Sequence, residues 1–213
     1  MCSAEAGWNS RLAVEEQRKL AGKEDRENLV YPRHPFSPSL CEKISRFSKG
    51  FSELALQRKL SFQFLNFLER IMTWLRTEAN TASKAATSPS RMADDVLGRS
   101  NPSITERVLA TALLAFCSSI ERRMGQANPP VEIFIQAQGK YLATHPDIRA
   151  CVDRDALEWT ALILQDTVAS GTDGWKWADQ ILRSKEVAMT AQKEAQLRDA
   201  FQLLTPKAKR LAG

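Results

Sequence analysis

Residues 51–75 read FSELALQRKLSFQFLNFLERIMTWL, the densest apolar stretch of the chain. Its large apolar residues recur three and four positions apart, which is the spacing of one face of an α-helix. They form two neighbouring stripes: Phe51, Leu54, Phe62, Leu65, Leu68, Met72 and Leu75 in one, and Leu60, Phe64, Phe67, Ile71 and Trp74 in the other. Two adjacent stripes predict a helix that is buried against more than one neighbour. We therefore expect residues 51–78 to form the central helix of an all-α domain.

The rest of the chain carries further helix signals and no alternating strand pattern of useful length. Helix starts are indicated, by capping residues or by proline, at Ser37-Pro38, Ser103 with Glu106, Pro129-Pro130, Asp153 and Thr172. Gly50 marks the expected end of the helix that precedes the central one. These signals predict an irregular helical bundle of about seven helices.

Composition divides the chain into segments. Residues 1–36 are polar and charge-mixed, which predicts a partly helical N-terminal arm, and residues 37–79 are expected to form a helical hairpin that contains the central helix. Residues 80–102 begin NTASKAATSPS and predict a linker or mobile loop, because small polar side chains cannot anchor a core. A helical bundle is expected over 103–206, followed by a basic tail at 207–213.

The amino-acid composition is that of a globular protein with a small net positive charge. Hydrophobic residues make up 43% of the chain and the formal net charge is +5, which suits contact with nucleic acid or an acidic surface but does not require it. The N-terminus lacks the pattern of a secretory signal, and the apolar run Val108 to Cys117 is too short to cross a bilayer. We therefore expect a cytoplasmic protein with no membrane contact.

The residues that carry chemistry form no catalytic or metal-binding motif. The four cysteines, none of them paired at the spacing of a metal site, are Cys2, Cys41, Cys117 and Cys151. The histidines, His34 and His145, have no nearby nucleophile, and no glycine-rich phosphate loop occurs. Asp153, Asp155 and Glu158 are candidate paired carboxylates, although acids at a helix start are also favoured by the helix dipole. We expect no enzyme, no catalytic residue, no metal, no cofactor and no small-molecule substrate.

Basic residues before and within the predicted central helix form the candidate nucleic-acid site. They are Lys43, Arg46, Lys49, Arg58 and Lys59. At helical spacing the first three share one side, opposite the apolar residues of their helix. A phosphate backbone binds such a stripe through charge and counterion release, without strong sequence specificity. If carboxylates instead lie between these cations in space, the stripe is only a solvated face.

Residues 91–109 resemble a helix-turn-helix motif. Gly98 would lie in the turn, Ile104 follows six residues later, and Ala93 is the small residue of the first helix, one position further from Gly98 than is usual. The resemblance implies groove contacts by Ser103, Thr105 and Arg107, and phosphate contacts by Arg91 and Arg99. The alternative is a flexible linker that leads into a capped core helix.

Residues 140–147 are similar to a short motif of J-domain co-chaperones. They read KYLATHPD and end in His145-Pro146-Asp147, the tripeptide with which that family stimulates a partner ATPase. The family's aromatic-rich first helix and the Lys-Asn that follows its tripeptide are absent here. The alternative is a helix that ends at Pro146, with Asp147 capping the next turn.

Three functions remain open from the sequence. The leading one is a non-enzymatic subunit or adaptor of a larger assembly that contacts nucleic acid through basic helix faces. The others are a pure protein–protein interaction module and a helix-turn-helix DNA-binding regulator. Trp175 lies beside Lys176 and ahead of Trp177, which continues an apolar face, so Trp175 is the expected partner contact.

Overall fold

The computed structural model describes residues 30–33, 35–78, 102–125, 128–184 and 189–203, and these contain helices and no strand. The helices are α2 (Pro38–Ser45), α3 (Lys49–Leu56), α4 (Phe62–Glu78), α6 (Ile104–Arg123), α7 (Pro129–Thr144), α8 (Ile148–Cys151), α9 (Arg154–Thr167), α10 (Asp173–Leu182) and α11 (Ala191–Ala200). The predictions for most of the N-terminal arm, for the linker and for the basic tail lie outside the described residues. Within the described ranges, no helix combines the length and apolar character that crossing a membrane requires.

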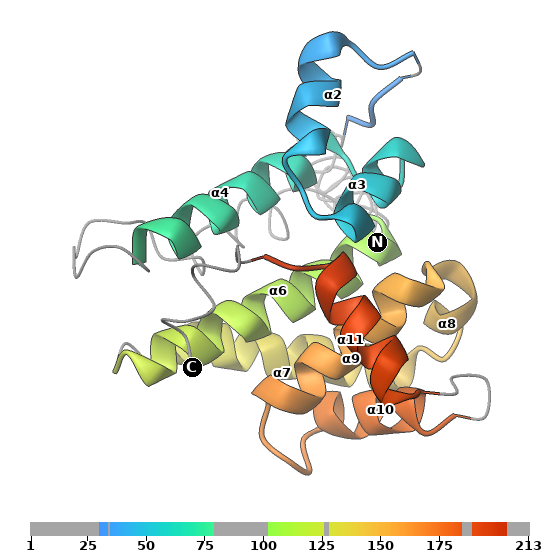
Figure 1. The fold of residues 1–213 in the computed structure, drawn as a ribbon. Helices are drawn as coiled ribbons and strands as arrows, with labels where there is room; N and C mark the ends of the chain where they lie inside the picture. Colours follow the sequence, from blue (N-terminus) through green and yellow to red (C-terminus); the bar gives the residue numbers. More distant parts are fainter. Residues whose placement is uncertain (1–29, 34, 79–101, 126–127, 185–188, 204–213) are drawn as a thin grey trace, which may run out of the picture.

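The helices form two parts that share one core. In Figure 1, α2, α3 and α4 lie above a bundle made of α6 to α11. The helix pairs that pack most extensively are α6 with α9, α9 with α10, α7 with α10, and α6 with α7. Both α6 and α9 are buried along most of their length, so this pair forms the middle of the bundle. The expected all-α bundle is confirmed.

The expected continuous helix over residues 51–78 is two helices, α3 and α4. Between them Arg58 adopts a left-handed conformation with φ 59°. Its amide donates to the Ala55 carbonyl, and the Lys59 amide donates to the Leu54 carbonyl, which together make a Schellman helix end. The two predicted apolar stripes are nevertheless buried or half-buried, and every member of the second stripe is at most 4% exposed. The break therefore changes the direction of the chain, but the apolar stripes on both sides of it still pack into the core.

The helix starts follow the capping signals of the sequence. A side-chain oxygen accepts from a first-turn amide at Ser37, Ser103, Asp153 and Thr172. Gly50 differs from its prediction, because it lies in the first turn of α3 and does not end α2. A Cβ atom at Gly50 would lie 2.7 Å from the ring of Phe201, so glycine here leaves room for that ring.

A pair of glycines sets the contact between α7 and α10. A Cβ atom at Gly139 would lie 2.8 Å from both Cα and N of Gly174, so the two helix backbones touch at this point. A backbone cannot move aside as a flexible side chain can, and the crossing therefore needs glycine at position 139.

Candidate nucleic-acid interface

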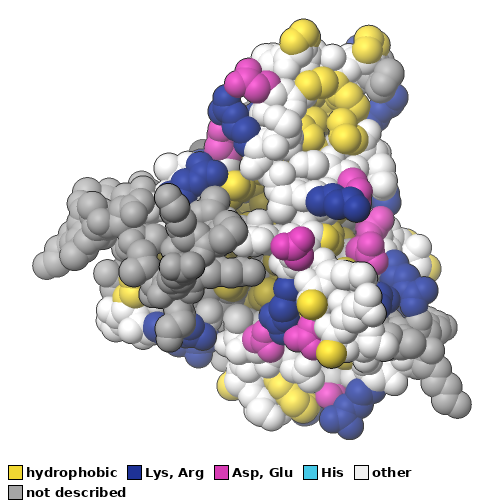
Figure 2. Space-filling view, in the orientation of Figure 1, with side chains coloured by type: hydrophobic (Ala, Val, Ile, Leu, Met, Phe, Trp, Pro, Cys, Tyr) yellow, Lys and Arg dark blue, Asp and Glu magenta, His cyan; other side chains and the backbone are white. Residues whose placement is uncertain are grey.

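The basic stripe predicted on α2 and α3 is largely neutralised by carboxylates. Lys43 Nζ lies 2.8 Å from Glu69 Oε2 on α4 and also donates to Asn66 Oδ1. The corresponding pairs are Arg46 with Glu42 (2.6 Å), Lys49 with Glu53 (3.8 Å) and Lys59 with Asp153 (2.8 Å). Figure 2 shows the same interleaving of basic and acidic side chains on the face drawn. A phosphate group would have to compete with a carboxylate at each of these four cations.

Asp153 is a structural carboxylate with two partners. It caps α9 by accepting from the amides of Asp155 and Ala156, and it accepts from Lys59 Nζ. Partial burial opposes its ionisation, but the hydrogen bonds from Lys59 and from the Ala156 amide hold the pKa of Asp153 below its usual value. The expected capping role is confirmed, and the carboxylate is ionised at neutral pH.

Arg58 is the member of the predicted stripe that has no ion-pair partner among the described residues. Its side chain is exposed, and its left-handed backbone is unusual for a residue with a Cβ atom. It is therefore one available cation, but it does not by itself make a stripe.

The described residues to which the helix-turn-helix resemblance assigned DNA contacts are engaged within the protein instead. Ser103 accepts from the Glu106 amide as the cap of α6, and Thr105 is 7% exposed. Arg107 lies with its Cζ atom 4.9 Å from the ring centroid of Tyr141, a cation–π contact between α6 and α7. Arg91 and Arg99 lie outside the described residues. A groove-reading role for Ser103 or Thr105 would require breaking these contacts.

The structure places Arg107, Tyr141 and His145 together in one stack. The rings of Tyr141 and His145 have centroids 4.1 Å apart and are inclined by 29°. His145 Nδ1 lies 2.8 Å from the Tyr141 carbonyl oxygen and 3.1 Å from Thr144 Oγ1, which fixes the orientation of the imidazole. The His145 ring is exposed, while Tyr141 and Arg107 are half-buried. The C-terminal end of α7 therefore presents a flat aromatic surface backed by a guanidinium group; we call these three residues the α7 stack.

Two further cations lie in the same segment as the α7 stack. Lys140 precedes Tyr141 on α7, and Arg149 belongs to α8, one turn beyond the Pro146 that follows His145. Both are exposed, and neither has an ion-pair partner among the described residues. The exposed Asp147 lowers the local positive charge, and it caps α8 by position without a side-chain hydrogen bond. The combination of an exposed ring and unpaired cations is what single-stranded nucleic acid binds.

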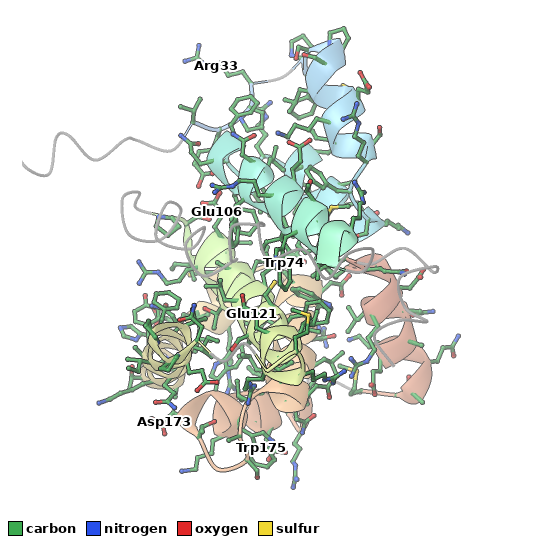
Figure 3. The ribbon with its side chains drawn as sticks, turned by 90° about the vertical axis from the view of Figure 1, so that its left-hand side faces the viewer. Arg33, Trp74, Glu106, Glu121, Asp173 and Trp175 are labelled. Atoms are coloured by element: carbon green, nitrogen blue, oxygen red, sulfur yellow. The ribbon has the colours of Figure 1, made fainter. Side chains whose placement is uncertain are left out.

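Glu106 holds the start of α6, and with it Arg107, in place. The carboxylate is completely buried, and it accepts from the Ser61 amide at 2.6 Å, the Ser103 amide at 3.0 Å and the Tyr31 hydroxyl at 2.9 Å. Figure 3 shows Glu106 at the junction of α4 and α6. The sequence indicated the capping box but not the partners on two other segments, because they lie far away along the chain.

The predicted partner contact Trp175 lies at the start of α10, next to Gly174, where α10 meets α7. It is half-buried in the first turn of α10, where its amide donates to Thr172 Oγ1, whereas Trp177 is 3% exposed, as expected. A cavity of about 420 Å³ opens beside this turn between α6, α7 and α9. Two of its polar residues are already engaged, because Arg122 donates to the Thr167 carbonyl and lies 3.6 Å from Glu132.

The described residues include free thiols but no cluster of metal-ligating side chains. No group of three His, Cys, Asp or Glu residues in them could hold a metal ion. Burial raises the pKa of the Cys117 thiol, and the nearby Glu121 acts in the same direction, so Cys117 stays protonated. Cys41 and Cys151 are exposed thiols.

The sequence did not point to Tyr141, Lys140 or Arg149 as members of this site. The Tyr141 ring is partly packed against the core. The signal that could have found the stack is the spacing of Tyr141 and His145, which places two rings one helical turn apart at the end of a helix.

Comparison with protein-family models, with curated proteins and with solved structures finds no match for this chain. Any functional assignment therefore rests on the chemistry of its own residues.

Proposed function

We propose that this protein is a non-enzymatic helical subunit or adaptor that contacts single-stranded nucleic acid through the α7 stack, without strong sequence specificity. The observation that carries the proposal is the exposed ring of His145, stacked on Tyr141 with Arg107 on the same ring system. Every nucleobase has a flat π-face, so one base can continue this stack whatever the sequence. Lys140 and Arg149 would then contact the adjoining phosphates.

The nucleic-acid site that we propose lies at the end of α7, whereas the sequence predicted it on α2 and α3. A phosphate at a cation that is already paired with a carboxylate meets the negative charge of that carboxylate and must compete with it. Lys140 and Arg149 have no carboxylate partner among the described residues, so a phosphate would meet no such competition there. The test is to compare the binding of labelled single-stranded oligonucleotides by the wild-type chain, by His145→Ala and by Lys43→Gln. Only His145→Ala should weaken binding.

A second candidate function is a pure protein–protein interaction module, and one observation favours it. Ile133 on α7 is 67% exposed, the largest exposure among the large apolar side chains of the described residues. Pro130 and Ala137 lie on the same exposed face, so this side of α7 has the apolar spacing of a helix that packs into a partner's groove. Co-purified proteins that are lost with Ile133→Asp but kept with Thr144→Asp, on the same face, would support this alternative.

A further inference from the structure

The cavity beside the start of α10 is large enough to hold a small molecule. It has a volume of about 420 Å³ and is bordered by α6, α7, the end of α9 and the turn that leads into α10; we call it the α10 cavity. Pockets that bind small molecules begin at about 300 Å³. Gly139 and Gly174 bring the backbones of α7 and α10 into contact beside this space, and Gly171 turns the chain into α10 with φ 86°. Backbone contacts therefore fix the positions of its walls.

The floor of the α10 cavity is apolar and carries one hydroxyl group. Ala115, Ile135 and Leu164 line the cavity and are at most 7% exposed. Ser118 lies one turn beyond Ala115 on α6, lines the same cavity and is 2% exposed. Its hydroxyl has no hydrogen-bond partner among the described residues, and a buried polar group without a partner costs free energy. A ligand with an apolar body and a polar end would bury the floor and supply the missing partner.

The rim of the cavity carries more negative than positive charge. Its ionisable side chains are Arg122, Glu132 and Asp173. Arg122 is engaged within the protein, because it donates to the Thr167 carbonyl at 2.6 Å and lies 3.6 Å from Glu132. Asp173 is exposed and has no ion-pair partner among the described residues; Figure 3 shows it at the end of α10 that approaches α7. The positive end of the α10 dipole offsets part of this charge, so the rim favours a cationic group by a modest amount.

We propose that the α10 cavity binds a small amine that has an apolar body and a hydrogen-bonding group at the end opposite the amine. The apolar body would lie on Ala115, Ile135 and Leu164. The hydrogen-bonding group would reach the hydroxyl of Ser118, and the ammonium group would lie at the rim with Asp173. This site uses no residue of the α7 stack and stands independently of the proposed function.

Three matched probes test the ligand class. They are tyramine, phenethylamine, which lacks the hydroxyl of tyramine, and 4-hydroxyphenylacetate, which ends in a carboxylate instead of an amine. Amide shifts in NMR spectra of the isotope-labelled full-length chain report binding, and those of 115–122 and 171–174 should move. Tyramine should bind with a Kd of about 10 mM or lower, as ordinary ligand efficiency gives for a molecule of its size.

The two other probes should bind more weakly than tyramine, each for its own reason. Phenethylamine should bind about 2- to 13-fold more weakly, because one hydrogen bond is lost. The carboxylate probe should bind about 2- to 30-fold more weakly, because attraction to Asp173 becomes repulsion.

Substitutions locate the two polar contacts. Ser118→Ala should reduce the affinity for tyramine to that for phenethylamine and leave the latter unchanged, because the same hydrogen bond is removed from either side. Ser119→Ala is the matched control, since its hydroxyl donates to the Phe116 carbonyl and does not line the cavity. Asp173→Asn should weaken tyramine by up to about fivefold, and Asp155→Asn in the first turn of α9 should not.

The proposal is overturned if tyramine at about 10 mM shifts no amide of the cavity in the wild type. Equal binding of tyramine and 4-hydroxyphenylacetate would overturn it too, since the rim would then not select a cation. The hydroxyl contact fails if the ratio of tyramine to phenethylamine affinity is the same in Ser118→Ala as in the wild type. Both Ser118→Ala and Asp173→Asn are small changes, and circular dichroism should show that each variant keeps the wild-type helix content.

Discussion

The hydroxyl of Tyr31 donates a hydrogen bond to Glu106 Oε2 at 2.9 Å, across 75 positions of sequence. This bond ties the segment that precedes α2 to the start of α6. The same carboxylate accepts from the Ser61 amide, just before α4, and the α4 amide of Phe62 donates to the Val30 carbonyl. One buried acid therefore joins three segments of the fold.

Replacing Tyr31 by phenylalanine should destabilise the protein, because it removes one donor from a buried carboxylate and keeps the ring. Hydrogen bonds to charged groups are worth about 1.5–3 kcal/mol, and the Tyr31→Phe variant should lose stability in that range. Urea unfolding measures the loss. Glu106→Ala should lose more than Tyr31→Phe, since it also leaves the Ser61 and Ser103 amides without their acceptor. Equal stability of Tyr31→Phe and wild type would show that the bond does not tie these segments together.

The same bond predicts a pH dependence at the alkaline end. Burial raises the pKa of Tyr31 from 10.0 to about 12, and the charge of Glu106 acts in the same direction. A raised folded-state pKa means that the stabilisation is present below pH 10 and is lost as the pH rises towards about 12. The stability difference between wild type and Tyr31→Phe should therefore shrink over this interval. The difference between the ultraviolet pH titrations of wild type and Tyr31→Phe gives the ionisation of Tyr31 without that of Tyr141. A midpoint of this ionisation near pH 10 would contradict the prediction.

The glycine crossing of α7 and α10 provides a matched pair of variants. Gly139→Ala places a methyl group 2.8 Å from the backbone of Gly174 and should cost about 1–3 kcal/mol, because the helices must move apart. Gly174→Ala places its methyl group 3.5 Å from Gly139 Cα, an ordinary contact, and should be neutral or slightly stabilising through helix propensity. Thermal or urea unfolding separates the two. Similar losses for both variants would show that the crossing is not limited by position 139.

The left-handed Arg58 predicts a stabilising substitution. Arg58→Gly should raise stability by about 0.5–1 kcal/mol, because glycine adopts positive φ without a Cβ penalty at this kind of helix end. Arg58→Ala removes the same charge but keeps the strain, so it should give no gain. If Arg58→Gly is no more stable than Arg58→Ala, the backbone strain contributes nothing measurable.

The features that the sequence predicted are the local ones. The caps at Ser103 and Asp153 depend on residues within one helical turn, and the apolar stripes of residues 51–75 repeat at helical spacing, so both were readable without tertiary structure. The break at Arg58 was not, because the helical period of the stripes continues through it and no glycine or proline marks it.

The features that the sequence could not predict depend on which helices meet. Lys59 pairs with Asp153, and Arg107 stacks on Tyr141, only because of how their helices pack. From the sequence alone, Lys59 looked like an available cation and Arg107 like a groove contact. Pairing between distant segments therefore decides which charges remain available. The spacing of residues along one helix does not reveal that pairing.

The central claim is that nucleic acid binds at the α7 stack, and oligonucleotide affinity measured against salt concentration tests it most directly. Fluorescence anisotropy with labelled single-stranded DNA and RNA of mixed sequence should show binding by the wild type that weakens as salt rises. His145→Ala should weaken it about 5- to 150-fold, the loss of one stacked base. Lys140→Gln with Arg149→Gln should flatten the log–log salt slope by about 1.4, while Lys43→Gln with Arg46→Gln should leave both quantities unchanged. No binding by the wild type at low salt, or a loss confined to the Lys43 and Arg46 variant, would contradict the account.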